Sequence, residues 1–198
     1  MSPRPDVSEE RTNQILDAAT EVFAEKGFHA TRMDDIVKEA GLSKGALYWY
    51  FKSKDDLIIA IFDRMFSREL SRLQALQDLP ASASERLIEF TERVIVDVKI
   101  MLRFMPLAYE FMALAFRNKV VQKAFKAYIN RYMDILIPII QQGIDSGEFK
   151  AKDAREVAIA SGAIFEGSIL LWVYDKDLIE PEKHICAGIH LLLDGLKA

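Results

Sequence analysis

Few side chains in this sequence are placed where they could act as catalytic groups. The histidines His29, His184 and His190 are scattered, and the single cysteine, Cys186, stands among apolar residues. The chain contains no H-E-x-x-H, G-x-S-x-G or glycine-rich phosphate motif, so we predict no enzyme active site and no cofactor. His184 and His190 do not share a helix face, which argues against a metal site.

Side chains that could contact a ligand gather instead between Ser43 and Phe51: they are Lys44, Tyr48, Trp49 and Tyr50. If this segment is a helix, Leu47 and Phe51 share its buried face, and Lys44, Tyr48 and Trp49 face solvent. Such groups can bind phosphates and the edges of bases. The alternative is an aromatic core run, although three adjacent bulky rings cannot all face one core.

The charge of the chain fits a nucleic-acid partner only locally. The whole chain has a formal net charge of -4, whereas phosphate binding usually leaves a basic footprint. The segment from Thr31 to Lys54 holds five Lys or Arg and three Asp or Glu residues, a net charge of +2. Positive charge is therefore concentrated around the candidate contact residues.

A helix-turn-helix would position these side chains. A short helix with an apolar face at Met33, Ile36, Val37 and Ala40 is predicted to end at Gly41, which can adopt the positive φ of the turn. We predict a capping pair of Thr31 and Asp34 before this helix, and Ser43 as the cap of the next one. A first helix begins near Ser8 and ends at Gly27.

The rest of the chain also has helical periodicity. With 51% hydrophobic and 28% charged residues, the composition is typical of a soluble, helix-rich protein. The lone cysteine and the absence of a leader favour a cytoplasmic location, and Glu166 interrupts the one membrane-like stretch, Val157 to Tyr174, so no membrane association is expected. Six further helices are predicted, beginning near Ser53 and then covering about 85–105, 107–117, 120–146, 153–174 and 181–195. Gly147 is predicted to end the helix at 120–146.

The run from Gly27 to Leu57, GFHATRMDDIVKEAGLSKGALYWYFKSKDDL, closely resembles the DNA-binding signature of the TetR family. The resemblance covers the N-terminal third. It implies an all-α fold of about nine helices, with a three-helix helix-turn-helix domain at 1–54, its fourth helix continuing to about 60, and a ligand-binding and dimerisation domain at 55–198.

The same resemblance implies a regulator that binds a near-palindromic operator on double-stranded DNA as a homodimer. A repressor released by a small, largely apolar effector is the expected form. Activation, a corepressor or a protein partner in place of the effector are alternatives that the sequence leaves open.

The resemblance also implies roles for individual DNA-binding residues. Lys44, Gly45, Ala46 and Trp49 would lie near base edges, and Thr31, Tyr48, Tyr50 and Lys54 would hold phosphates, with Arg32 and Ser43 completing the set. Val37 departs from the alanine usual in the family. Because Gly45 has no side chain, specificity is expected to depend on Lys44, Trp49 and DNA shape.

The middle of the chain is rich in aromatic and methionine side chains, which form either an ordinary core or, as the resemblance implies, an effector pocket. The predicted lining is Phe104, Tyr109, Met112, Phe116, Tyr128, Tyr132, Phe165 and Trp172, with Arg103, Glu110 and Glu166 as polar candidates. Glu166 could be a buried acceptor, an interchain hydrogen-bond partner or simply exposed.

The last two helices have faces too apolar to leave in water, and they resemble the four-helix dimer interface of the family. The predicted interface residues are Gly162, Phe165, Ile169, Trp172, Val173, Ile185, Gly188, Ile189 and Leu192.

Overall fold

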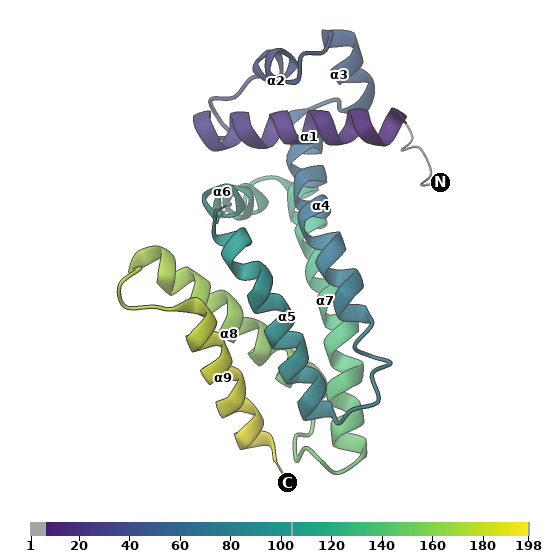
Figure 1. The fold of residues 1–198 in the computed structure, drawn as a ribbon, viewed down its shortest axis with the longest axis vertical. Coiled ribbons are helices and arrows are strands. Elements are labelled where there is room, and N and C mark those ends of the chain that lie inside the picture. The colour runs from purple at the N-terminus through teal and green to yellow at the C-terminus, as the bar shows by residue number, and fades with distance from the viewer. Residues whose placement is uncertain (1–6, 104, 198) are drawn as a thin grey trace. The chain divides into compact units, whose positions relative to one another are not determined.

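The structure is a computed structural model that describes residues 7–103 and 105–197. These residues form nine α-helices and one isolated bridge, between Phe149 and Lys197, with no strand among them. The all-α prediction is confirmed, and the helices begin and end within a few residues of the predicted positions. They are α1 (Val7–Lys26), α2 (Met33–Ala40), α3 (Lys44–Tyr50), α4 (Lys54–Gln74), α5 (Ala83–Arg103), α6 (Met105–Ala115), α7 (Lys119–Asp145), α8 (Ala154–Tyr174) and α9 (Pro181–Leu196) (Figure 1).

Three of the predicted helix stops are glycines with a left-handed backbone. Gly27, Gly41 and Gly147 have φ values of 75°, 63° and 77°, and they follow α1, α2 and α7. A residue with a side chain is strained in this region, so glycine fixes where these helices end.

Side chains cap several helix starts. The Ser53 Oγ accepts a hydrogen bond from the Asp56 amide at 3.1 Å, and Asp56 accepts one from the Ser53 amide at 3.0 Å, as expected for a capping box. The predicted pairing of Thr31 with Asp34 is wrong. Helix α2 begins later, and Asp35 accepts the Arg32 amide at 2.8 Å, because Thr31 is turned into the interior.

The chain divides into two compact units. The first, which we call the head unit, comprises residues up to Ser67 together with Arg103–Tyr128; the second, the body unit, comprises Arg68–Leu102 and Ile129–Ala198. Helix α6 and the first part of α7 therefore fold with the helix-turn-helix, although the predicted domain boundary lay at residue 54.

The head unit has its own hydrophobic core. Ile15, Ile36, Leu47 and Leu57, from α1, α2, α3 and α4, are fully buried in it. Helix α6 contributes Phe111, whose ring stacks on that of Phe62 with centroids 4.0 Å apart and an interplanar angle of 13°. The packing of α3 is thus continuous with that of α6.

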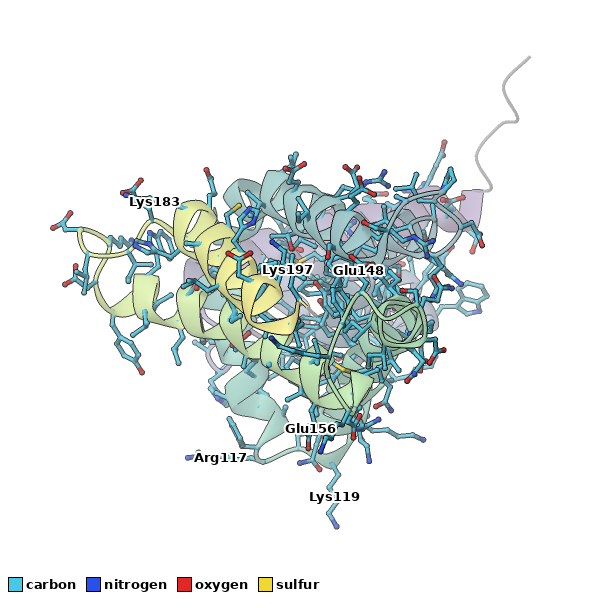
Figure 2. All side chains as sticks on the ribbon, turned by 90° about the horizontal axis from the view of Figure 1, so that it is seen from below. Arg117, Lys119, Glu148, Glu156, Lys183 and Lys197 are labelled. Atoms are coloured by element: carbon cyan, nitrogen blue, oxygen red, sulfur yellow. The ribbon has the colours of Figure 1, made fainter. Side chains whose placement is uncertain are left out.

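In the body unit, Glu148 caps the N-terminus of α5 by accepting hydrogen bonds from its first backbone amides. Its carboxylate accepts hydrogen bonds from the Ala83 and Ser84 amides, both at 2.9 Å. Glu148, which follows α7 in the body unit and is half-buried, is labelled in Figure 2. Burial raises the pKa of Glu148, but the hydrogen bonds from Ser84 and Ala83 and the charge of Arg86 outweigh it, so the net pKa is lowered.

The close packing near this cap predicts a strong effect of Gly143→Ala. A Cβ at Gly143 would overlap the Phe149 ring and lie 2.8 Å from the Ala83 Cβ. We expect a loss of about 1–3 kcal/mol in the free energy of unfolding, measured by urea denaturation, despite the better helix propensity of alanine. Gly195→Ala is the control, since a Cβ there meets nothing within 4 Å; equal stability of the two variants would contradict the packing described.

Candidate functional site

Helix α3 is held by one buried side chain and one cap. Leu47 is fully buried in the head core, and the Ser43 Oγ accepts a hydrogen bond from the Ala46 amide at 3.2 Å, as predicted. The Gln14 side chain joins α1 to the end of α2 by donating to the Ala40 carbonyl at 2.8 Å. The outer face of α3 is therefore fixed relative to α1 and α2.

The outward face of α3 carries the predicted base-contact residues. Trp49 is 69% exposed, and its ring meets that of Tyr50 edge-on with centroids 4.6 Å apart. Lys44 and Gly45 are exposed, while Ala46 is half-buried. Tyr48 and Tyr50 are half-buried against the head core. An aromatic core run is therefore excluded for Trp49, and the predicted solvent-facing orientation of Lys44 and Trp49 is confirmed, whereas Tyr48, also predicted to face solvent, packs partly on the core.

Lys44 forms an ion pair across the two helices of the motif. Its Nζ lies 2.8 Å from the Asp34 Oδ1, and the hydrogen bond with Asp34 raises the pKa of Lys44. Both side chains are largely exposed, and surface pairs of this kind are weak. The ammonium group is thus charged and able to exchange Asp34 for another partner.

Two predicted phosphate contacts are directed inward. Thr31 is 1% exposed, and its hydroxyl donates to the Gly27 carbonyl at 2.8 Å, so the prediction that its side chain holds phosphate is wrong. The Lys54 Nζ donates to the Phe28 and His29 carbonyls at 2.6 and 3.3 Å, which leaves at most one N–H for a phosphate. Burial lowers the pKa of Lys54.

The roles of two polar residues at the site were not predicted from the sequence, and Glu110, predicted as a polar candidate for the effector pocket, lies in the head unit instead. The Lys52 Nζ donates to the carbonyls of Tyr48 and Trp49 at the C-terminus of α3, a role that a lysine just beyond a helix end could have signalled. The Glu110 carboxylate accepts the Phe28 amide at 2.8 Å from 82 positions away, and no local pattern reveals such a contact.

The body unit holds a small cavity of about 10 Å³, close to the space that one water molecule needs. Its wall is mostly apolar, and the hydroxyls of Thr91 and Ser161 donate to the Leu87 and Val157 carbonyls of their own helices. The lining residues are Leu87, Phe90, Thr91, Tyr132, Leu136, Ser161, Gly162, Phe165, Ile189 and Leu193.

Among the described residues of the predicted effector lining, Tyr132 and Phe165 alone belong to this cavity. Four others, Tyr109, Met112, Phe116 and Tyr128, lie in the head unit, where Phe116 is 87% exposed. Phe104 lies outside the described residues, as does the side chain of Arg103. The predicted set therefore does not form one site within the body unit.

Trp172 and Glu166 do not line the cavity either. The Lys176 Nζ lies 5.0 Å from the centroid of the half-buried Trp172 ring. Glu166 is exposed on α8, and desolvation by its apolar surroundings raises its pKa. The single chain therefore does not bury Glu166, and its role as an interchain hydrogen-bond partner stays a prediction.

Several predicted dimer residues are buried within the chain itself. Phe165, Ile169, Ile185 and Ile189 are each at most 9% exposed, because they form the contact between α8 and α9 and the body core. Gly188 packs on Ile164, which would lie 2.7 Å from a Cβ at this position. The side chains of the four buried residues face the core of their own chain, contrary to the predicted interface; Val173 is exposed, and Gly162, Trp172, Gly188 and Leu192 are half-buried, so their place in an interface stays a prediction.

The exposed side of α8 is also apolar. Ile159 is 53% and Val173 39% exposed, and Ala163, Glu166 and Leu170 lie between them at alternating spacings of four and three residues. By length and composition α8 could cross a membrane, but its other face packs into the body unit. This helix therefore has one apolar face inside the chain and one at its surface.

Comparison with known proteins gives matches over most of the chain. The family model for bacterial regulatory proteins of the tetR family matches residues 15–61, and that for the QacR-like protein C-terminal region matches residues 73–198. The fatty acid metabolism regulator protein of Bacillus subtilis is 29% identical over 193 residues, covering 92% of this chain and 94% of its own.

Solved structures have the same fold. A putative transcriptional regulator from Pseudomonas aeruginosa matches with a TM-score of 0.85 at 19% identity, covering 96% of this chain and 92% of its own. The transcriptional regulator FadR from Bacillus subtilis in complex with stearoyl-CoA matches with a TM-score of 0.76 at 25% identity, covering 93% and 98%. With a capped, outward-facing helix α3 and a family model that matches more than half of its length, the chain belongs to the TetR family of DNA-binding transcriptional regulators.

Proposed function

We propose that this regulator represses transcription by binding a near-palindromic operator as a homodimer, and that an effector with a long apolar part releases it. The observation that carries the proposal is the geometry of α3. Leu47 anchors the helix from beneath, and Lys44, Gly45 and Trp49 face outward. This is the arrangement that a recognition helix needs to enter a major groove.

The side chains of α3 divide into two proposed roles. The Lys44 ammonium donates to guanine O6 or N7, and the exposed Trp49 ring packs on a thymine methyl. Tyr48, Tyr50 and Arg32, with the amides at the start of α4, bind phosphates and set the register on the duplex. A Cβ at Gly45 would meet nothing within 4 Å of the protein, so the space outside α3 is open to a base pair.

The first test replaces Lys44 by alanine and Tyr50 by phenylalanine in separate proteins. After the operator is selected from random duplexes, we expect each variant to bind it at least about tenfold more weakly, with unchanged helical circular dichroism. Lys44→Ala should also relax the preference at one base pair, because a base contact is lost. Glu21→Ala, on the exposed surface of α1, is the control. Wild-type affinity in both test variants would contradict the assignment.

The exposed face of α8 supports the homodimer. Residues 159, 163, 166, 170 and 173 repeat at spacings of four and three, which is the pattern of side chains that interlock between packed helices. Four of the five are apolar, and such a face is covered when it meets its own copy about a two-fold axis. Two heads can then reach successive major grooves about 34 Å apart.

Ile159→Glu tests this face. A charge at an exposed position costs a monomer little, but at the two-fold contact a second carboxylate beside Glu166 in the same face lacks a cationic partner. We expect wild-type protein to scatter light as a dimer at micromolar concentration and the variant to scatter as a monomer. Val120→Glu, which alters an exposed valine of α7 in the head unit, should remain dimeric; a dimeric Ile159→Glu protein would exclude this face.

The effector proposal rests on the apolar wall of the body cavity and on the stearoyl-CoA complex of a related regulator. A ligand of that size needs several hundred cubic ångströms, far more than this cavity, so its binding requires α5, α7, α8 and α9 to separate. A ligand that binds only the separated arrangement shifts the population towards it and changes operator affinity reciprocally.

Stearoyl-CoA is therefore the probe, with coenzyme A alone as its control. Excess stearoyl-CoA should raise the melting temperature and release the operator, whereas coenzyme A should do neither, since a ligand at about 100 times its Kd adds about 2.7 kcal/mol of stability. Gly162→Leu places a side chain in the cavity wall and should abolish both responses, while Gly195→Leu should retain them. Operator release that persists in Gly162→Leu would place the effector elsewhere.

A further inference from the structure

We propose that Glu110 of α6 is a positioning residue for DNA recognition. It holds the loop between α1 and α2, residues 27–32, and thereby fixes the orientation of α2 and α3. The inference rests on the proposed function, because it names what controls the same DNA-reading surface. Glu110 belongs to the head unit and makes no contact with DNA itself in this proposal.

Glu110 meets the loop at its first bend. Its Oε2 accepts the Phe28 amide at 2.8 Å, and its Oε1 lies 3.1 Å from the position that a Cβ on Gly27 would occupy. The left-handed backbone of Gly27, with φ of 75°, turns the Phe28 amide towards α6. Glycine is therefore needed here both for the turn and for the close approach of the carboxylate.

Lys54 holds the other side of the same bend. Its Nζ donates to the Phe28 and His29 carbonyls and lies 4.7 Å from the centroid of the Phe28 ring. Burial lowers the pKa of Lys54, and the negative charges of Asp55 and Glu110 oppose that shift. The peptide groups of Phe28 are thus held from α6 through the amide and from α4 through the carbonyl.

Among the described residues, the remaining hydrogen bonds of the loop join it to itself, to α1 and to α2, where Asp35 accepts the Arg32 amide. Thr31 donates its amide and its hydroxyl to the Gly27 carbonyl, and the Gly27 amide donates to the Phe23 carbonyl. The Phe28 ring is 4% exposed and packs on Phe23 with centroids 5.2 Å apart. Glu110 is therefore the contact through which α6 acts on the loop backbone.

A small displacement of α6 is enough to break this contact. Helix shifts of about 1 Å accompany many switching transitions, and a bond of 2.8 Å lengthened by that amount exceeds the range of a hydrogen bond. Helix α2 begins two residues after Thr31, and α2 and α3 contain eight and seven residues. Helices this short keep their direction only through the contacts around them.

The test compares Glu110→Ala, Glu110→Gln and the surface control Glu21→Ala. Operator binding and binding to a random duplex of equal length are measured at one salt concentration, with light scattering and circular dichroism to confirm assembly and folding. Hydrogen exchange of the Phe28 amide is followed in the protein without DNA.

We expect Glu110→Ala to lose at least about tenfold in operator affinity while random-duplex affinity stays within about twofold, because the phosphate contacts remain. The Phe28 amide should exchange at least about tenfold faster in Glu110→Ala, since it loses its acceptor. Glu110→Gln keeps an acceptor oxygen and should restore both properties to within about threefold of wild type.

Three outcomes would overturn the positioning role. These are wild-type operator affinity in Glu110→Ala, an equal loss on both duplexes, which indicates general destabilisation, and unchanged exchange of the Phe28 amide. If the wild-type protein prefers no duplex over another, the proposed function fails instead. The exchange measurement, which uses no DNA, still decides whether Glu110 holds the loop.

Discussion

The DNA-reading surface depends on the burial of Leu47. A helix of seven residues is unstable in isolation, because its nucleation costs more than its few hydrogen bonds return. Burying one leucine side chain contributes about 1.5–3 kcal/mol, and the Ser43 cap adds about 1 kcal/mol. With the inner side held by Leu47, the outer side can carry Trp49, a large exposed ring that adds little to folding.

The features predicted correctly from the sequence are those set by neighbouring residues. Ser43, Ser53 and the glycines at 27, 41 and 147 act within one turn of their own position, so their residue types reveal the helix ends. Thr31 was misassigned for the opposite reason. A threonine before a helix can either cap the helix or bury its hydroxyl. Here the Thr31 hydroxyl is buried, because it donates to the Gly27 carbonyl and packs in the head core.

Faces of the C-terminal helices could not be assigned from periodicity. Helix α8 is apolar on two sides: Phe165 and Ile169 are buried within the chain, whereas Ile159 and Val173 are exposed. A hydrophobic pattern identifies apolar residues but not which partner covers them, so the two faces were merged in the predicted interface. The aromatic residues of the predicted effector lining are likewise divided between two separately packed units, which the sequence pattern does not reveal.

The net charge of +2 between Thr31 and Lys54 overstates the charge that can reach DNA. Lys52 and Lys54 both donate to backbone carbonyls of the head unit, Lys52 at the end of α3 and Lys54 at the loop after α1. Lys44 instead pairs with exposed Asp34, a partner that DNA can replace at low cost. Two lysines of this segment therefore stabilise the backbone of the surface, and Lys44 supplies positive charge that DNA can contact. Lys52 and Lys54 thus hold the backbone at the end of α3 and in the loop after α1, a role that counting charges along the sequence does not reveal.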